Sequence, residues 1–389
     1  MPYEPSDNNL TATLCLTPLP GRSVAAAAAL VSDLTDWSAV FTQAAQWDVE
    51  AVVMSNLSRF LIQYIPEPYR TQVVSREREA RAFNISHALI TVQLASLLER
   101  EGIRVIVIKG AAVGVSAYGD ASLRGSSDID LLVRRADLPR ARRVLESNGY
   151  NCDYDLRIEP SLISGGHALE LTNGRFRVEL HWRLLETHLR WDPEPDEIWE
   201  FSRRVPCVGG EINVLAPHVE FLFLCAHGVK HRWLSGKWVC DIAQLAARLS
   251  DDDVLNVIAL SERTRAKRIL HVALRLTQEI LGFSDERFPR EYFSNDASVN
   301  ELVVHAKGQL LGIAAASNRS RRVEMDYRLS ALISWLAARE SWIDKAAISF
   351  YVTFLPTGKE KLRGRAGWIV RPFNVLVTGT KAFARTRFA

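Results

Sequence analysis

The chain has 389 residues, of which 48% are hydrophobic, and its formal net charge is +3. This length allows two or three packed units, and so small a charge does not indicate nucleic-acid binding through bulk electrostatics. The five cysteines are scattered without a Cys-x-x-Cys pair, which indicates neither a zinc knuckle nor a disulfide framework and favours a reducing cytoplasm. We also expect neither a signal peptide nor a membrane span, because no apolar run approaches the roughly 20 residues of a spanning helix.

Helical periodicity dominates the first hundred residues. The predicted helices cover residues 25–34, 37–47, 49–64 and 72–99. Pro66 and Pro68 separate the last two, because proline interrupts the hydrogen bonds of a helix interior. We therefore predict an N-terminal helical region at residues 1–100.

From residue 101 onward, short strands alternate with helices. β-Branched and apolar runs predict strands, and amphipathic runs predict helices. The strands cover residues 104–108, 126–133 and 175–182, and the helices cover residues 111–118 and 138–147. Such alternation is typical of an α/β core with a mixed sheet, which we place at residues 101–215.

After Pro217 the helical pattern returns. The six helices expected there cover residues 218–233, 237–249, 252–260, 266–281, 300–315 and 328–336. We therefore predict a helical domain at residues 216–345. The fold class is α+β, with a small mixed β-sheet core flanked by N-terminal helices and this C-terminal helical domain.

The last part of the chain, residues 346–389, is a basic C-terminal segment. From residue 358 to the end it contains eight Lys or Arg and one acid. The default interpretation of such a segment is a solvated face, and the second is a surface for a polyanion or a partner.

Two aspartates stand out in the second predicted strand. Asp128 and Asp130 alternate with Ile129 and Leu131, so the two carboxylates are expected on one face of the strand. Mg²⁺ prefers oxygen ligands and is commonly held by one or two carboxylates together with substrate phosphates. The pair therefore predicts a magnesium site, although two exposed acids on an edge strand would give the same pattern.

A third acid, Glu179, lies in the third predicted strand. If this strand pairs beside the strand of Asp128 and Asp130, Glu179 projects toward the same metal ions. Three such acids suit in-line phosphoryl transfer with two Mg²⁺ ions. Taken alone, Glu179 could equally be a solvated strand residue.

The first strand ends in Lys109-Gly110 and leads into a helix. Such a turn leaves backbone N–H groups free to bind an anion, so Lys109 and Gly110 are candidate phosphate ligands. Alternatively, Lys109 is a lysine at the start of a helix that has no functional role.

These motifs together resemble a known superfamily. The pattern consists of Lys109-Gly110, Tyr118-Gly119, Arg124, Asp128-Ile129-Asp130 and Glu179-Leu180-His181-Trp182. It is similar to that of the polymerase-beta-type nucleotidyltransferases, and within them to a bacterial nucleotidyltransferase family whose members are poorly characterised. The resemblance extends to the N-terminal helices, to residues 226–233, and to Leu355-Pro356 and Val370-Arg371-Pro372 near the end.

The resemblance implies roles for single residues. Asp128, Asp130 and Glu179 would bind metal, and Glu179 could also be the base that receives the proton of the acceptor. Arg124 would contact the triphosphate, where a planar donor fork suits phosphate. A plain ion pair between Arg124 and Asp128 is the alternative.

A polar patch is expected on the predicted helix 218–233 and the helix after it. We place Lys230, His231 and Asp241 at the nucleotide or acceptor pocket, with a hydrogen-bonded cluster between domains as the alternative. His227 and His231 have the i, i+4 spacing of a zinc site but lack a metalloprotease glutamate between them. A structural or substrate-contacting role is therefore favoured for both histidines.

The combined hypothesis is a Mg²⁺-dependent nucleotidyltransferase of the cytoplasm. It would move a nucleoside monophosphate from an NTP, by the habit of the superfamily ATP, to an acceptor and release pyrophosphate. Two alternatives stay open: a nucleotide-binding regulatory or scaffold protein without turnover, and an enzyme whose acceptor is a macromolecule such as tRNA, a protein or a peptide. The acceptor, the nucleobase of the NTP and the oligomeric state do not follow from the sequence.

Overall fold

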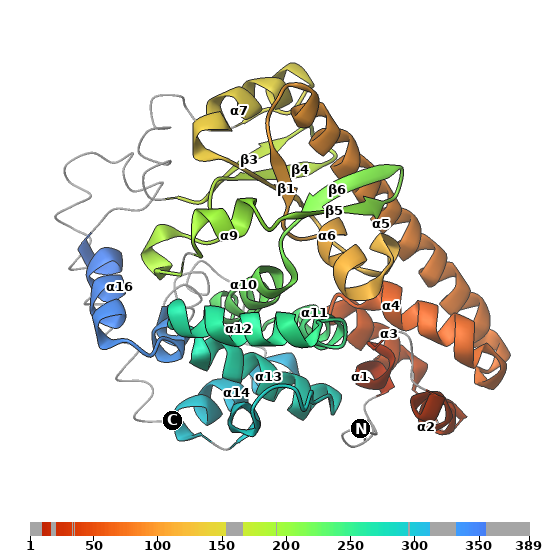
Figure 1. Ribbon diagram of the computed structural model, residues 1–389. Helices are drawn as coiled ribbons and strands as arrows, with labels where there is room; N and C mark the ends of the chain where they lie inside the picture. Colours follow the sequence, from red (N-terminus) through yellow and green to blue (C-terminus); the bar gives the residue numbers. More distant parts are fainter. Residues whose placement is uncertain are drawn as a thin grey trace.

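The computed structural model shows an α+β protein in which a mixed sheet lies among helices, as predicted (Figure 1). It describes residues 10–16, 21–32, 34, 36–152, 166–191, 193–294, 296–311 and 332–354. Most of the predicted basic segment, including Leu355-Pro356 and Val370-Arg371-Pro372, lies outside the described residues. So do parts of the predicted helices 300–315 and 328–336, and the division of the chain into four parts stays a prediction.

The sheet has six strands in the described residues. They are β1 (Val105–Val107), β2 (Ile129–Val133), β3 (Ala168–Thr172), β4 (Arg177–His181), β5 (Arg203–Cys207) and β6 (Gly210–Val214). Their order across the sheet is β3-β4-β2-β1-β6-β5. β2 is parallel to β4, and β1 is antiparallel to β2 and parallel to β6. The predicted strands correspond to β1, β2 and β4, so the expected pairing of the two acidic strands is confirmed.

Helices precede, interrupt and follow the sheet. Before it come α1 (Leu10–Leu14), α2 (Gly21–Ser32), α3 (Trp37–Gln46), α4 (Glu50–Asn56) and α5 (Glu67–Arg100). Between its strands lie α6 (Ala111–Val113), α7 (Leu138–Ser147) and α9 (Pro195–Trp199). After it come α10 (Pro217–Lys230), α11 (Gly236–Ala246), α12 (Asp251–Arg263), α13 (Lys267–Leu281), α14 (Ala297–Leu310) and α16 (Trp342–Phe354).

Two predicted helices continue into irregular turns. After α4, the chain forms a π-helix at Leu57–Leu61, and after α6 it forms another at Gly114–Tyr118. The long helix α5 begins at Glu67, whereas the prediction placed its start at residue 72. Pro68, which was expected to precede the helix, lies in its first turn. Proline is tolerated there, since the first N–H groups of a helix have no partner within the helix.

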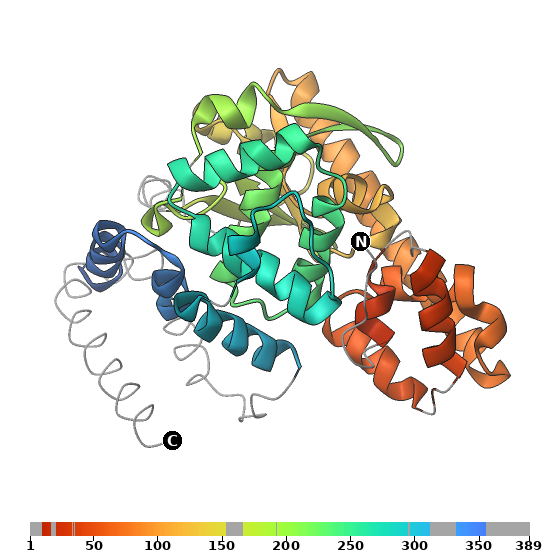
Figure 2. The ribbon, with the colours of Figure 1, turned by 60° about the horizontal axis from the view of Figure 1, so that its bottom comes forward.

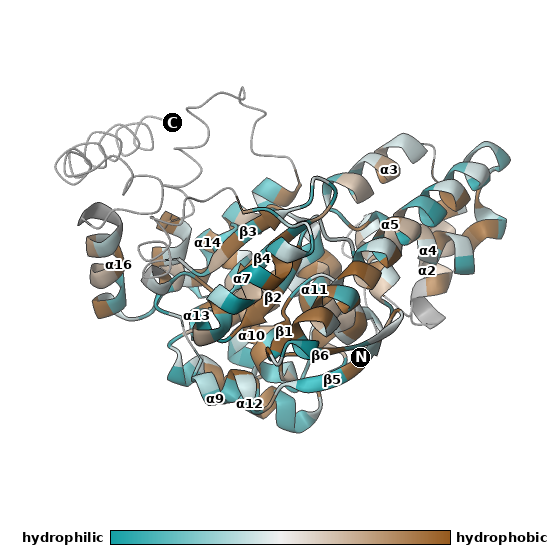
Figure 3. Ribbon diagram, turned by 90° about the horizontal axis from the view of Figure 1, so that it is seen from above, coloured by the Kyte–Doolittle hydropathy of each residue, from teal (hydrophilic) through white to brown (hydrophobic). Residues whose placement is uncertain are grey.

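The two faces of the sheet belong to two different cores, because side chains alternate along a strand. Ile129 and Leu131 of β2 pack in one cluster with residues of α5 and α7. Leu132 and Ile106 face the other way, into the core that α10, α11 and α13 build. Figure 3 shows the central strands β1 and β2 as mostly hydrophobic. By the same alternation, Asp130 lies on the same face of β2 as Leu132 and points toward the core that α10, α11 and α13 build.

The N-terminal helices share that second core. Trp47 Nε1 donates a hydrogen bond to the carbonyl oxygen of Leu310 (3.0 Å), and Gln244 Nε2 donates to that of Cys15 (3.1 Å). A Cβ atom at Gly236 would overlap the Trp47 ring, so only glycine allows this close approach of α11. Figure 2 shows α1 to α4 gathered at one end of the molecule, with α16 at the other. No helix of the described residues has the length and apolar character to cross a membrane.

Candidate active site

Asp130 and Glu179 lie directly opposite each other on the parallel strands β2 and β4. His181 follows Glu179 by two residues and therefore points to the same face of the sheet. Asp130 is 1% exposed, whereas the side chain of Glu179 is 29% exposed. The cluster is thus closed at Asp130 and reachable from solvent at Glu179.

His181 connects the two carboxylates. Its Nε2 atom lies 3.1 Å from Asp130 Oδ1 and 3.1 Å from Glu179 Oε2. One ligand atom of each of the three residues lies within 4.8 Å of the other two. The second oxygen of Asp130, Oδ2, is buried and has no hydrogen-bond partner among the described residues. Because a buried oxygen without a partner is costly, this set of donors fits a metal ion.

Lys109 also reaches this cluster. Its Nζ atom lies 2.6 Å from Asp130 Oδ1 and 3.9 Å from Glu179 Oε2. The chain turns at Gly110 with a φ of +56°, which glycine adopts without steric cost, and the following α6 has only three residues. At these distances, the Lys109 ammonium group lies between the carboxylates of Asp130 and Glu179. The roles of Lys109 and Gly110 toward a triphosphate stay predictions.

The charges of the cluster shift its pKa values. Burial raises the pKa of Asp130, but Lys109 and His181 outweigh this effect and hold it well below its usual range. A hydrogen bond with His181 is the main reason why the pKa of Glu179 is lowered. Both carboxylates are therefore charged at neutral pH, as ligands of a metal ion must be.

Asp128 lies beside this cluster and is not part of it. It precedes the first residue of β2, and its Oδ1 accepts a hydrogen bond from Ser126 Oγ (3.2 Å). Burial, and next the charge of Asp130, raises the pKa of Asp128. The structure thus gathers Asp130 and Glu179 with His181 rather than with Asp128, whose role as a metal ligand stays a prediction.

Arg124 forms a buried ion pair with Asp241 of α11. Its Nη2 lies 3.0 Å from Asp241 Oδ2, and the two side chains are 5% and 0% exposed. Tyr118 Oη donates to the other carboxylate oxygen over 2.9 Å. This geometry is a hydrogen-bonded cluster, as in the alternative that we considered for Asp241. Arg124 pairs with Asp241 and not with Asp128, and its contact with a triphosphate stays a prediction.

A substitution separates these two roles of Arg124. We expect Arg124→Met to lower the free energy of unfolding by about 3 to 5 kcal/mol, because Asp241 stays buried without its partner. The double variant Arg124→Met/Asp241→Asn should recover much of this loss, since the amide is neutral and still accepts from Tyr118. Urea unfolding measures both. Unchanged stability together with weaker NTP binding would instead assign Arg124 to the triphosphate.

Lys230, at the end of α10, is connected to the cluster by two further residues, Glu186 and His167. Its Nζ is 2.8 Å from Glu186 Oε1, and His167 Nδ1 is 3.8 Å from the same oxygen. The ring of His167 lies 5.3 Å from that of His181, measured between centroids. Sequence reasoning missed Glu186 and His167, which lie in no motif. It named His181 only within a motif, although its place two residues after Glu179 was a usable signal.

His227 of α10 and His231, which directly follows this helix, have adjacent rings. Their ring centroids are 4.5 Å apart, and both rings contact Trp238. Burial, followed by the charges of Lys230 and Lys109, lowers the pKa of His231 to about 4, so this ring is neutral at pH 7. Contact with substrate by Lys230 and His231 stays a prediction.

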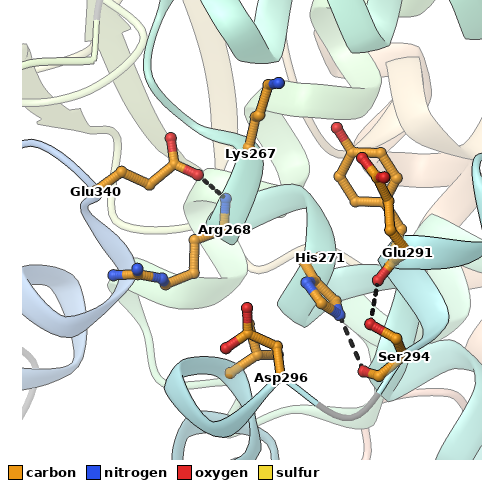
Figure 4. Close-up of a pocket in the computed structure, with 9 residues that line it drawn as sticks. Lys267, Arg268, His271, Glu291, Ser294, Asp296 and Glu340 are labelled. Atoms are coloured by element: carbon orange, nitrogen blue, oxygen red, sulfur yellow. Dashed lines mark hydrogen bonds between the residues drawn. The ribbon is translucent and has the colours of Figure 1, made fainter.

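A separate hollow of about 240 Å³ lies between α13, α14 and the turn Arg290–Phe293 (Figure 4). Its polar groups largely pair with one another. His271 Nε2 lies 3.3 Å from the carbonyl oxygen of Ser294, and Glu340 accepts from the backbone N–H of Arg268 (3.0 Å). It shares no residue with the acidic cluster, and its lining mixes three acids with Lys267, Arg268 and His271, so its chemistry points to no particular ligand.

The candidate site thus consists of two carboxylates on adjacent parallel strands, next to a turn that begins with Lys109-Gly110. Residues 33–282 match a family described as uncharacterised nucleotidyltransferase. Because this match covers more than half of the sequence, the chain belongs to that family. No curated protein and no solved structure matches the chain.

Proposed function

We propose that the protein is a Mg²⁺-dependent nucleotidyltransferase that moves a nucleoside monophosphate, with AMP from ATP as the first candidate, to an acceptor. The family match supports transfer of this kind. The observation that carries the proposal is the register that sets Asp130 opposite Glu179, with Asp130 Oδ2 buried and unpartnered. We further propose that the enzyme works in the cytoplasm.

The reaction exchanges one phosphorus–oxygen bond for another. An oxygen of the acceptor forms a bond to the α-phosphorus of the NTP, and the bond from that phosphorus to the bridging oxygen breaks. The electron pair of the broken bond leaves on pyrophosphate, and the acceptor gives up a proton. Glu179, charged and partly open to solvent, is the proposed receiver of this proton.

Asp130 and Glu179 would hold the metal, with Asp128 as a further ligand from its place beside them. When bound, the metal, two Mg²⁺ ions by superfamily habit, supplies positive charge that stabilises the phosphate oxygens. Lys109 stands within reach of both carboxylates and is proposed to bind the triphosphate together with Gly110. Lys230 and His231 are proposed to border the acceptor pocket.

Transfer of label tests this function. The purified protein is incubated with each of the four NTPs labelled at the α-phosphate, with Mg²⁺ or EDTA, and with fractions of a cell extract. We expect pyrophosphate release and a labelled product that requires Mg²⁺ and is absent with Asp130→Asn. NTP binding without pyrophosphate release in any fraction would favour a regulatory or scaffold protein.

The nature of the acceptor follows from the same assay. If the labelled product is a tRNA, a protein or a peptide, it is retained by size and digested by nuclease or protease. A macromolecular polyanion bound through the basic segment would also make transfer fall steeply with salt, because phosphate contacts release counterions. A small acceptor gives no such slope.

A further inference from the structure

Three donors of two kinds converge in the candidate metal site. Asp130 and Glu179 contribute carboxylate oxygens, and His181 contributes a nitrogen, Nε2, placed 3.1 Å from one oxygen of each acid. Neighbouring ligands of an octahedral ion, each about 2.1 Å from it, are about 3 Å apart. The observed separations from Nε2 therefore match those of ligands that share one ion.

The second ring nitrogen of His181 is held separately. Nδ1 lies 3.3 Å from the carbonyl oxygen of Arg183. In the absence of an ion, Nε2–H donates to the two acids. In a metal-bound state, Nδ1 would carry the hydrogen and donate it to this carbonyl, so that the lone pair of Nε2 would point to the ion. Histidines that bind metals are commonly fixed in this way, because a hydrogen bond at one nitrogen sets the tautomer and leaves the other free for the ion.

A second observation points to a ligand at this place. Asp130 is 1% exposed, and its Oδ2 has no hydrogen-bond partner among the described residues. His181 Nε2 and Lys109 Nζ both approach the other oxygen, Oδ1. Oδ2 is thus a buried carboxylate oxygen that no described residue partners and that can bind a cation in addition to Lys109.

We propose that His181 is a metal ligand through Nε2, so that the site presents two oxygens and one nitrogen and prefers Mn²⁺ to Mg²⁺. This proposal rests on the metal site of the proposed function and changes the expected ion. Mg²⁺ suits oxygen ligands, whereas an imidazole nitrogen favours first-row transition ions. Two carboxylates beside one imidazole suit Mn²⁺, which accepts both kinds of donor.

Electron paramagnetic resonance of the full chain with Mn²⁺ tests the proposal without any substrate. Electron spin-echo modulation should show coupling of one ¹⁴N nucleus to the bound ion, and growth with ¹⁵N-labelled histidine should change this coupling to that of ¹⁵N. His181→Asn should remove the coupling and weaken Mn²⁺ binding by roughly tenfold or more. The matched control is His167→Asn, which alters a neighbouring ring and should retain the coupling.

Each contrary outcome has one meaning. Bound Mn²⁺ without nitrogen coupling, or coupling that persists in His181→Asn, would overturn His181 as a ligand and leave the proposed function intact. Displacement of Mn²⁺ by an equal concentration of Mg²⁺ would overturn the preference. If neither ion binds to the unmodified protein, even with ATP present, the metal-dependent function itself fails. The labelled-histidine measurement needs no variant, so a folding defect of His181→Asn would not prevent a decision.

Discussion

Asp130→Asn is expected to lower the rate of pyrophosphate release by about a hundredfold to a thousandfold. The carboxylate is the buried ligand of the candidate metal site, and a bound metal contributes several kcal/mol to stabilisation of a phosphoryl transition state. The amide has nearly the same shape, so the change removes a charge and little volume. A steady-state assay of released pyrophosphate, with the assay conditions of the proposed function, measures this loss.

Stability has to be measured beside activity, because Asp130 is also the partner of Lys109. Removing one member of a buried ion pair costs about 3 to 5 kcal/mol, so Asp130→Asn should unfold at lower urea concentration. The double variant Asp130→Asn/Lys109→Met restores the charge balance and should regain stability while staying inactive. Recovery of activity in the double variant would show that only folding had been impaired.

Glu170→Gln is the matched control for this experiment. Glu170 of β3 stands in register with Glu179, but its side chain is 51% exposed and pairs with Arg177 at the surface. Exposed ion pairs contribute little, so we expect both rate and stability to change only slightly. Because directly paired residues project to the same face of a sheet, Glu170 is an exposed neighbour of Glu179 on the face of the site. A large loss of activity in Glu170→Gln would contradict the restriction of the site to Asp130, Glu179 and His181.

Glu179→Gln is expected to lower the rate by a similar factor, and its response to metal distinguishes two roles. If Glu179 only completes the ligand set, a higher concentration of Mg²⁺ or Mn²⁺ should restore part of the activity, since the variant binds metal more weakly. If Glu179 receives the acceptor's proton, saturating metal leaves the rate low, because the base itself is missing.

The pH dependence gives an independent measurement of the same residue. The hydrogen bond with His181 lowers the pKa of Glu179 in the metal-free protein, and a bound cation would lower it in the same direction, so the unmodified enzyme should keep a charged glutamate down to a pH below the ordinary glutamate value. Activity limited by Glu179 should therefore fall only at a pH below the ordinary glutamate pKa, as the carboxylate becomes protonated. The Gln variant should lack this fall if Glu179 is the base. A fall of the same size in both proteins would assign the acidic limb to another group.

Local pattern was enough to predict the acidic strands. The alternation of polar and apolar residues around Asp130 and around Glu179 indicates a strand in each case. That the two strands lie side by side was a hypothesis, which the register of Asp130 opposite Glu179 confirms. The hairpin β5–β6 was missed because Arg203, Arg204 and Pro206 give β5 a polar composition, as Figure 3 shows by its hydrophilic colour. β3 was missed as well.

Contacts between distant residues were beyond such patterns. Arg124 and Asp241 are 117 positions apart, and nothing in either neighbourhood indicates that the two charges meet. Each was therefore assigned to a ligand pocket on the likeness of its surroundings. The position of Lys109 against Asp130 likewise depends on how β1 and β2 pair, because a lysine side chain can reach several places from one backbone position.

The N-terminal helices and α10 to α14 share one core, and this affects which parts of the protein can be transferred separately in evolution. A cut at the predicted boundary near residue 100 would separate Trp47 from Gly236 and Leu310, and would strip α5 from the sheet that it covers. Neither piece could bury its apolar surface alone. We therefore expect gene fusion or recombination to transfer this unit to another protein only as a whole.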